Sequence, residues 1–325
     1  MQPSSRQPDE RLPNPNVEEE ELSSYSGPWE FVDGPLGDRF LLPTAPGDHP
    51  VFQDGAARLD GRLVYLDLSL ESGRNQLDRV SGPLTVTLPN DALLVDDLVP
   101  MLQEVDEHHI VGAYVSAVAL PRVSAMPALQ MLDARDERVT NAELEHLSTL
   151  ANLRVLYLGS TQVTDAGLVH LAGLTQLQRL DLRLTPVADA GLAHLAGLTQ
   201  LELLDLRYTQ VTDIGLRHLS TLTQLRMLYL GHTRITNAGL AHLSSLQELL
   251  VLRLQGTQIS DAGLVHLSRL RELLVLDLSD TRVTDAGLPQ LVGMTQLQTL
   301  YLGAHVTDAG ISALQGARPE LDILR

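Results

Sequence analysis

The chain of 325 residues lacks cysteine and lysine, and aromatic residues make up only 3% of it. Without cysteine it forms no disulfide, no thiolate metal cluster and no cysteine nucleophile. No run of 18 apolar residues is present to span a bilayer, and the residues after Met1 lack the apolar stretch of a signal peptide. These absences predict a soluble cytoplasmic protein without a membrane partner.

Basic charge is also scarce. The 23 basic residues are all arginine and stand against 41 acidic residues, so the formal net charge is -18. A nucleic-acid binder needs a basic face to neutralise phosphate groups. The charge balance therefore predicts that nucleic acid is not a partner.

Acidity and proline are concentrated at the N-terminus, in residues 1–38. This segment contains six of the 17 prolines and the run Glu18-Glu19-Glu20-Glu21. Such a composition buries too little apolar surface to offset the entropy lost on ordering, so we predict a disordered, acidic, proline-rich tail. A solvated tail and an acidic interaction segment are the two interpretations of its charge run.

An internal repeat of 24 residues occupies residues 127–325. Seven full rows cover residues 127–294, and a shortened eighth row begins at Thr295. In the second row Leu153, Leu156 and Leu158 follow the pattern L-x-x-L-x-L, which is typical of a half-buried strand. Leu168 and Leu171 then recur at the spacing of a short helix that begins after Thr164-Asp165. The sequence predicts an α/β solenoid: a curved horseshoe with a parallel β-sheet on its concave face and short helices on its convex face.

The row pattern L-x-x-L-x-L-x-x-T-x-V-T-D-A-G-L-x-H-L-x-x-L resembles the leucine-rich repeat family, and in particular bacterial GALA-type repeats, which are similar to those of F-box leucine-rich repeat proteins. The resemblance implies a non-enzymatic scaffold, without a cofactor, that binds a protein partner. The family has Asn at the ninth position of the pattern, where its side chain bonds the loop backbone of adjacent repeats. Here Thr161 and its equivalents stand there, so we expect a ladder of hydroxyl groups to do the same.

Residues 39–126 are predicted to form an N-terminal capping region of degenerate repeats. Leu63, Leu66 and Leu68 fit the strand pattern, and residues 84–86 followed by residues 91–102 read as strand then helix. A first alternative is an F-box-like adaptor or effector that recruits a ubiquitin-ligase component through residues 84–126 and is delivered into a host cell, because residues 88–94 (LPNDALL) resemble the opening of an F-box. A second alternative is an enzyme or enzyme inhibitor that uses residues 39–126.

Histidine and aspartate also recur every 24 residues. An even ladder of histidines does not cluster as metal ligands must, so we interpret it as lateral packing between helices and predict no metal site. Asp165 and its equivalents are interpreted as helix caps, because a cap is needed in every row whereas a catalytic site is unique. Nucleophile-elbow, P-loop, dinucleotide-binding and zinc-protease motifs are missing, and no catalytic residue is predicted.

The candidate binding residues are those that vary on the outward-facing strand positions, on the concave face. Tyrosine and arginine beside apolar residues are typical of protein-binding hot spots. The alternative interpretation is an internal ladder of Asp–Arg pairs across adjacent strands. The predicted protein-binding residues are Tyr157, Arg179, Asp181, Arg183, Asp205, Arg207, Tyr208, Tyr229, His232 and Arg253.

Overall fold

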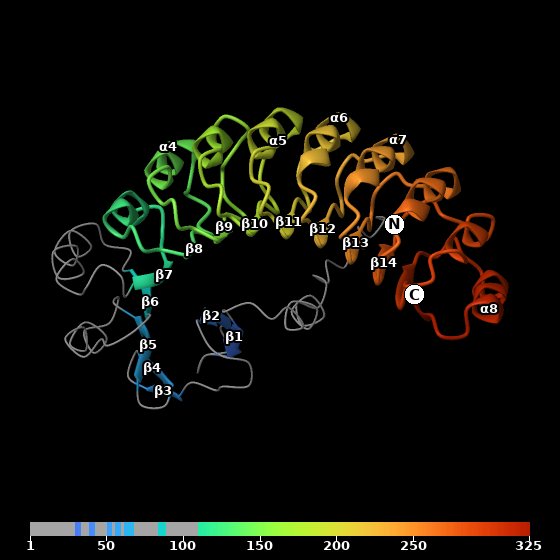
Figure 1. Cartoon of the computed structure of the whole chain (residues 1–325), viewed down its shortest axis with the longest axis horizontal. Helices are drawn as coiled ribbons and strands as arrows, with labels where there is room; N and C mark the ends of the chain where they lie inside the picture. The colour runs from blue at the N-terminus through green and yellow to red at the C-terminus, as the bar shows by residue number, and fades with distance from the viewer. Residues whose placement is uncertain are drawn as a thin grey trace, which may run out of the picture.

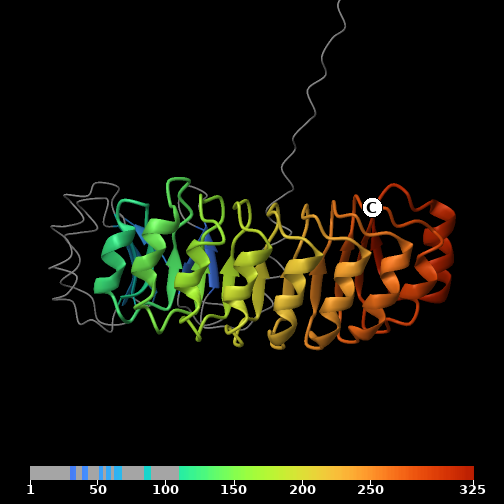
Figure 2. The same ribbon diagram turned by 90° about the horizontal axis from the view of Figure 1, so that it is seen from above.

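The computed structural model describes residues 30–33, 39–42, 51–53, 56–59, 62–67, 84–88 and 110–325. Residues 110–325 wind into an arch with strands along the inner, concave side and short helices along the outer, convex side (Figure 1). Seen from above, the helices follow one another in a row (Figure 2). The predicted curved solenoid is confirmed.

One 14-stranded sheet runs through the arch in chain order, from β3 to β16. Its first two strand pairs are antiparallel, and every pair from β5 onward is parallel. The strands are β3 (Val51–Gln53), β4 (Ala56–Leu59), β5 (Arg62–Asp67), β6 (Leu84–Thr87), β7 (Ile110–Tyr114), β8 (Met131–Asp133), β9 (Val155–Tyr157), β10 (Arg179–Asp181), β11 (Leu203–Asp205), β12 (Met227–Tyr229), β13 (Val251–Arg253), β14 (Val275–Leu278), β15 (Thr299–Leu302) and β16 (Asp322–Leu324).

Each repeat returns to the next strand through a short helix, and most of these helices are wholly or partly of the 3₁₀ type. The 3₁₀ form has three residues per turn, which matches the spacing of Leu168 and Leu171 better than the 3.6 of an α-helix. The helical segments are η2 (Leu120–Ala125), α4 (Asn141–Leu144), η3 (Glu145–Leu147), η4 (Gly167–Leu171), α5 (Asp189–Leu195), α6 (Asp213–Leu216), η5 (Arg217–Thr221), α7 (Asn237–Leu240), η6 (Ala241–Ser245), η7 (Asp261–Arg269), η8 (Leu288–Leu291) and α8 (Asp308–Ala317).

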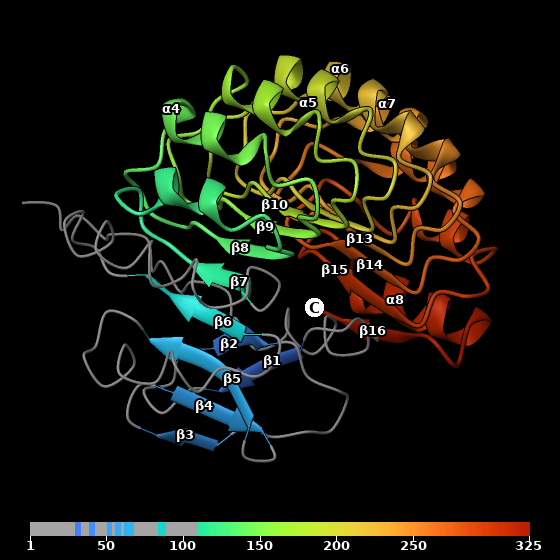
Figure 3. The same cartoon turned by 60° about the vertical axis from the view of Figure 1, so that its left-hand side comes forward.

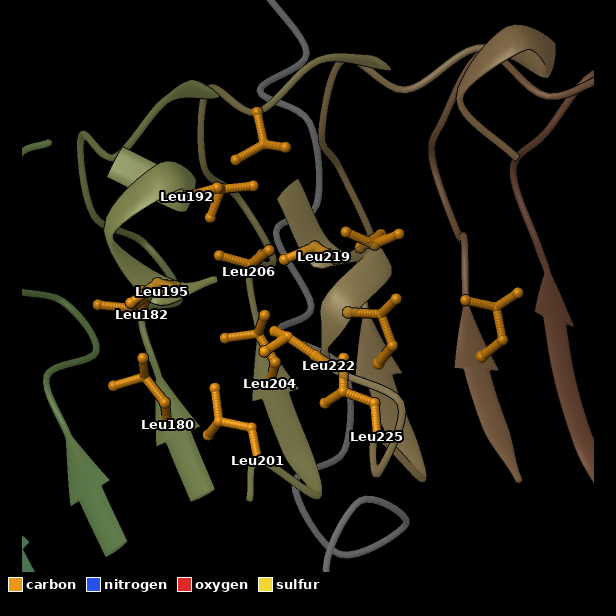
Figure 4. Close-up of a cluster of buried hydrophobic side chains, with 14 of the residues drawn as sticks. Leu180, Leu182, Leu192, Leu195, Leu201, Leu204, Leu206, Leu219, Leu222 and Leu225 are labelled. Carbon is orange, nitrogen blue, oxygen red and sulfur yellow. The ribbon is translucent and has the colours of Figure 1, made fainter. Parts of the chain in front are cut away.

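Leucine columns fill the space between sheet and helices. Leu204 in β11 and Leu206, just after β11, point away from the concave side into the space between sheet and helices. There they meet Leu219 from the helix of the same repeat (Figure 4). All three side chains are fully buried. Burying one leucine contributes about 2 kcal/mol, and every column is shared with the repeats on either side. The core is therefore continuous along the solenoid, and no repeat has a closed core of its own.

The recurring aspartates hold neighbouring repeats together, so their interpretation as helix caps is corrected. Asp189 Oδ1 accepts from the backbone N–H of Thr212 (2.7 Å) and its Oδ2 accepts from the Thr212 hydroxyl (2.6 Å) in the next repeat. The helix cap is the threonine itself, since Thr212 accepts from the N–H of Ile214. The aspartate stands at the first helical position, from where its side chain reaches forward to the following repeat.

The threonines at the ninth pattern position close their own turn. Each hydroxyl donates to the carbonyl three residues earlier, as from Thr161 to Leu158 (2.7 Å) and from Thr209 to Leu206 (2.7 Å). The expected ladder of hydroxyl groups between adjacent repeats is therefore wrong. A threonine side chain is too short to reach the next repeat from this position, and the aspartates supply that link.

The N-terminal predictions fall partly outside the described residues. Of the predicted tail, Glu30–Asp33 is described as strand β1, which pairs antiparallel with β2 (Arg39–Leu42) across the predicted boundary at residue 38. Within residues 39–126, the strands predicted at residues 63–68 and 84–86 coincide with β5 and β6, and both join the main sheet. The helix predicted over residues 91–102 lies outside the described residues. Of residues 88–94, which resemble the opening of an F-box, only Leu88 is described, and it is buried just after β6. Of the wider segment 84–126, the described residues include β6, β7 and η2, and β6 and β7 pair within the main sheet.

Candidate protein-binding face

The outward positions of the strands form columns across the concave face because adjacent strands pair without a shift from β8 to β14. Asp181 in β10 lies between Tyr157 in β9 and Asp205 in β11. Tyr229 in β12 pairs with Asp205 on one side and with Arg253 in β13 on the other. The repeat therefore brings the predicted residues of strands β9 to β13 together on one surface.

Burial divides the predicted residues into three groups. Tyr157 and Arg183 are half-buried, and only Tyr208 and His232 are exposed. The sequence predicts a half-buried strand with solvent-facing outward residues, but the outward side chains at the centre of the arch are mostly buried. The fully buried members are Arg179, Asp181, Asp205, Arg207, Tyr229 and Arg253.

Charged side chains on the concave face pair mainly within a repeat. Arg207 Nη2 lies 2.6 Å from Asp205 Oδ2, and Arg183 Nε lies 3.4 Å from Asp181 Oδ2. These partners stand two residues apart, where both side chains point to the same side of an extended segment. Arg253 instead reaches across to Asp277 in the next strand, at 3.6 Å. The Arg253–Asp277 pair is of the predicted kind, across adjacent strands, whereas the Asp181–Arg183 and Asp205–Arg207 pairs each lie within one repeat.

Aromatic and apolar side chains alternate with these charges. The Arg207 guanidinium lies over the Tyr229 ring, 5.2 Å from its centroid, and that of Arg253 lies 5.9 Å from the same centroid. Leu203 and Met227 pack against Tyr229 to form an apolar patch in the middle of the face. Such contacts leave arginine charged while lowering its hydration, which is the environment that protein-binding hot spots favour.

Burial changes the acid–base properties of the face. Burial raises the pKa of Asp205 well above its usual range, and the nearby carboxyl of Asp181 adds to that shift. Burial also raises the pKa of Asp181 and lowers that of Arg207 to about 10. The Asp205–Arg207 pair is short, yet desolvation outweighs mutual attraction in both partners.

A ridge of residues with positive φ follows the strands, one residue per repeat. We call Ser160, Leu184, Tyr208, His232, Gly256 and Asp280 the turn ridge; their φ angles lie between 54° and 66°. The left-handed region disfavours a leucine or tyrosine side chain. Hydrogen bonds along the ridge hold this backbone in place, as from the N–H of Leu184 to the carbonyl of Arg207 (2.9 Å) and from that of Tyr208 to the carbonyl of Gly231 (3.0 Å).

The turn ridge carries the exposed apolar residues of the site. The side chains of Leu184 and Tyr208 are 53% and 44% exposed. Tyr208 stacks on His232 with ring centroids 4.4 Å apart and planes inclined by 9°. The His232 ring in turn lies over Gly256, where a Cβ atom would collide with it. The sequence predicts Tyr208 and His232 but misses Leu184, although the 24-residue period places it in the same column.

An open hollow of about 810 Å³ adjoins the face where strands β7 to β10 end. Arg135, Arg138 and Arg183 line it together with acidic residues. Arg135 is bonded to Asp133 and Arg138 to Asp136. The hollow can therefore take polar groups at its rim.

The histidine ladder lies on the convex helices. Five of the six are half-buried, while His242 is exposed. Within the described residues, no group of three or more histidine, aspartate or glutamate side chains is arranged to hold a metal ion. In that same part of the chain, no helix has the length and apolar character needed to cross a bilayer. The ladder members are His146, His170, His194, His218, His242 and His266.

Comparisons with known proteins agree on the repeat. A family model described as a leucine-rich repeat region matches residues 138–321. An internalin from Listeria monocytogenes has a similar structure, with a TM-score of 0.54, 19% identity, and coverage of 80% of this chain and 85% of the internalin. A leucine-rich repeat protein from Leptospira interrogans has a TM-score of 0.52 at 16% identity, and the match covers 77% of this chain and 68% of that protein. Curated protein sequences give no significant match.

Proposed function

The chain belongs to the leucine-rich repeat family, and from that premise we propose that it is a non-enzymatic scaffold that binds a protein partner on its concave face and the adjoining turn ridge. Solenoids of this kind commonly present an extended concave surface to another protein. The partner would lie along strands β9 to β13, over the Tyr229 patch, with its edge on the turn ridge.

The turn ridge is the observation that carries the proposal. Leu184 and Tyr208 are large, exposed side chains held in a backbone region that disfavours them. Asparagine or glycine at these positions would relieve the strain and remove exposed apolar surface. Strained exposed residues of this kind gather at ligand-binding sites, because folding alone does not favour them.

The proposal is tested by capture of a partner with variants of the ridge. The double variant Leu184→Asn with Tyr208→Asn removes both apolar side chains and suits the left-handed backbone, so it retains the fold. Substitution of Arg207 or Tyr229 is unsuitable, because both side chains are buried and their loss would disturb the fold as well as the surface. We expect the ridge variant to capture at least tenfold less of the partner that the unmodified chain captures, a loss of about 1.4 kcal/mol or more.

The matched control removes a similar apolar area from the convex side. Val169 and Val265 lie on η4 and η7 and are 48% and 52% exposed. The double variant Val169→Gln with Val265→Gln is expected to capture the partner as the unmodified chain does. Equal capture by the ridge variant and the unmodified chain would refute the ridge as part of the binding surface.

A further inference from the structure

The segments that link each strand to the following helix form a second hydrogen-bonded ladder between repeats. We call the interface between two successive repeats a joint. At the joint between the third and fourth repeats, the N–H of Gln210 donates to the carbonyl of Val187 (2.8 Å), and Thr212 donates from its N–H and its hydroxyl to the Asp189 carboxylate. Equivalent bonds are made at four other joints by Gln162 with Thr164, Arg234 with Thr236, Gln258 with Ser260 and Arg282 with Thr284.

The joint between the second repeat (residues 151–174) and the third (residues 175–198) keeps only one of these three bonds. Pro186 stands where the repeats on either side have glutamine, and proline has no N–H to donate to the preceding repeat. Ala188 stands where those repeats have threonine. Its N–H donates to Asp165 (2.7 Å), but it has no hydroxyl to make the remaining bond. This joint is therefore the least firmly tied of the interior joints on its linking segments.

Ala188 also leaves the helix of the third repeat without a side-chain cap. It precedes α5 and accepts no hydrogen bond there, whereas Thr212 and Thr236 each accept from an N–H in the first turn of α6 and α7. Loss of such a cap weakens the first turn of a helix. The start of α5 is therefore held less firmly than the start of α6, both to its own first turn and to the preceding repeat.

The strand side of the same joint is intact. Strands β9 and β10 pair without a shift and lie side by side on the concave side (Figure 3). The N–H of Leu158 donates to the carbonyl of Asp181 (2.9 Å), and the N–H of Ser160 donates to the carbonyl of Arg183 (2.8 Å). A joint that is tied along its strands but poorly tied towards its helices can rotate about the strands, since the bonds farther from that axis would resist the rotation.

We propose that the joint between the second and third repeats is a hinge at which the solenoid changes its curvature. Rotation about β9 and β10 alters the separation of the helical segments η4 and α5 and leaves the repeats on either side intact. The inference goes beyond the proposed function and does not rest on it, because it concerns the chain without a partner.

The hinge crosses the hollow beside the concave face. Arg135 and Ser160 line the hollow of about 810 Å³ from before the hinge, and Arg183 lines it from beyond the hinge. Each of the two arginines pairs with an aspartate of its own repeat, Arg135 with Asp133 and Arg183 with Asp181. Rotation at the hinge therefore changes the width of the hollow and the distance between these charge pairs.

Pulsed electron resonance on the full chain measures the hinge. Because the chain lacks cysteine, pairs of nitroxide labels can be introduced at exposed helix positions that lie three repeats apart. The pair Val169→Cys with Ala241→Cys spans the hinge, and the pair Ala193→Cys with Val265→Cys spans three joints beyond it. We expect the first pair to give a distance distribution about twice as broad as that of the second. Equal widths for the two pairs would overturn the hinge.

A repaired joint tests the cause. Pro186→Gln with Ala188→Thr introduces the residues that the repeats on either side carry at these positions, so it supplies the missing donors. We expect the repaired chain to narrow the Val169–Ala241 distribution to the width of the Ala193–Val265 distribution, which stays unchanged. A Val169–Ala241 distribution that keeps its width after the repair would overturn the missing bonds as the origin of the hinge.

Hydrogen exchange gives a readout that needs no label. The N–H groups of Ala188 and Thr212 donate to equivalent aspartates, each at 2.7 Å. After correction for intrinsic rates, we expect the Ala188 amide to exchange about tenfold faster than the Thr212 amide, because opening of the hinge exposes the first but not the second. The repaired chain should lose this difference. Equal protection of the two amides in the unmodified chain would overturn the hinge even if a labelled variant failed to fold.

Discussion

At the scale of single residues, the concave face depends on buried charge pairs that are costly to break. The side chains of Asp205 and Arg207 are 5% and 7% exposed. Burial raises the pKa of Asp205 and lowers that of Arg207 to about 10. Asp205 Oδ1 also accepts from the Arg207 backbone N–H at 3.0 Å. A pair of this kind stabilises the fold less than its short distance suggests, but neither partner tolerates loss of the other.

We predict that Arg207→Gln lowers the free energy of unfolding by about 3 kcal/mol at neutral pH, because the buried Asp205 carboxylate loses its partner. The double variant Asp205→Asn with Arg207→Gln is expected within about 1 kcal/mol of the unmodified chain. Urea unfolding of Arg207→Gln, of Asp205→Asn and of the double variant measures the coupling energy between the two side chains. Additive losses in the double variant would contradict it.

The pH dependence of Arg207→Gln follows from the raised pKa of Asp205. Burial disfavours the carboxylate, so the folded state binds a proton more readily than the unfolded state. This contribution lowers stability as pH rises from the ordinary aspartate range through the raised pKa. The loss of unfolding free energy caused by Arg207→Gln should therefore become smaller as the pH falls from 7.5 to 5. A loss that grows on acidification would contradict the raised pKa of Asp205.

The glycine near the start of most of the helices, which follows Asp-Ala in most repeats and Asp213-Ile214 at Gly215, has a steric role. A Cβ at Gly215 would lie 2.5 Å from Asp189 Oδ1, whereas a Cβ at Gly197 would meet nothing within 4 Å. Alanine in place of a helical glycine ordinarily stabilises a protein by up to about 1 kcal/mol. We predict the opposite sign at Gly215, a loss of about 1–3 kcal/mol from overpacking, while Gly197→Ala is neutral or stabilising. Thermal unfolding compares them, and a stabilised Gly215→Ala would refute the steric role.

At the scale of one repeat, the strand and helix were predictable because leucine spacing reports them directly. The roles of Thr209 and Asp189 were not, since sequence gives the column in which a side chain stands but not the distance over which it bonds. The burial of the outward side chains on the concave face could not be predicted from the sequence either. Alternation marks Arg179 and Tyr229 as outward-facing, but it says nothing about what covers them. Leu184 was predictable from the column shared by Tyr208 and His232.

The link between repeats gives a prediction at this scale. Asp189→Ala removes two hydrogen bonds to the next repeat, and charge-assisted bonds contribute roughly 1.5–3 kcal/mol each. We expect a loss of at least about 2 kcal/mol in urea unfolding. Asp308 stands at the same motif position in the last repeat, where its side chain is exposed and bonds Arg325, so Asp308→Ala should cost under about 1 kcal/mol. Equal losses of unfolding free energy in the two variants would contradict the role of the recurring aspartates in linking adjacent repeats.

At the scale of the whole molecule, stability is distributed along one dimension. Each repeat contacts its two neighbours, so the interior repeats have two interfaces and the terminal ones have fewer. Arg318 closes the C-terminal end by donating to the carbonyls of Met294 (2.7 Å), Thr295 (3.2 Å) and Leu297 (3.0 Å). Along the arch, the outward side chains of the successive strands β9 to β13 lie on one continuous concave face.

Hydrogen exchange should reveal this distribution. Leu204 lies in an interior repeat and Leu300 near the C-terminal end, and both are fully buried. Truncation of either to alanine costs about 3 kcal/mol locally. We predict that Leu204→Ala speeds amide exchange in the repeats on both of its sides, whereas Leu300→Ala speeds it only from β14 onward. Uniform acceleration along the chain in both variants would contradict a one-dimensional solenoid.

The central claim is that a protein partner binds the concave side and its turn ridge. The most direct measurement places a photoreactive phenylalanine analogue at position 208 or at position 169 and compares the crosslinked products in cells. The account predicts a partner crosslinked from position 208, on the ridge, and none from position 169, on the convex helices. A partner crosslinked only from position 169, or equally from both, would contradict it.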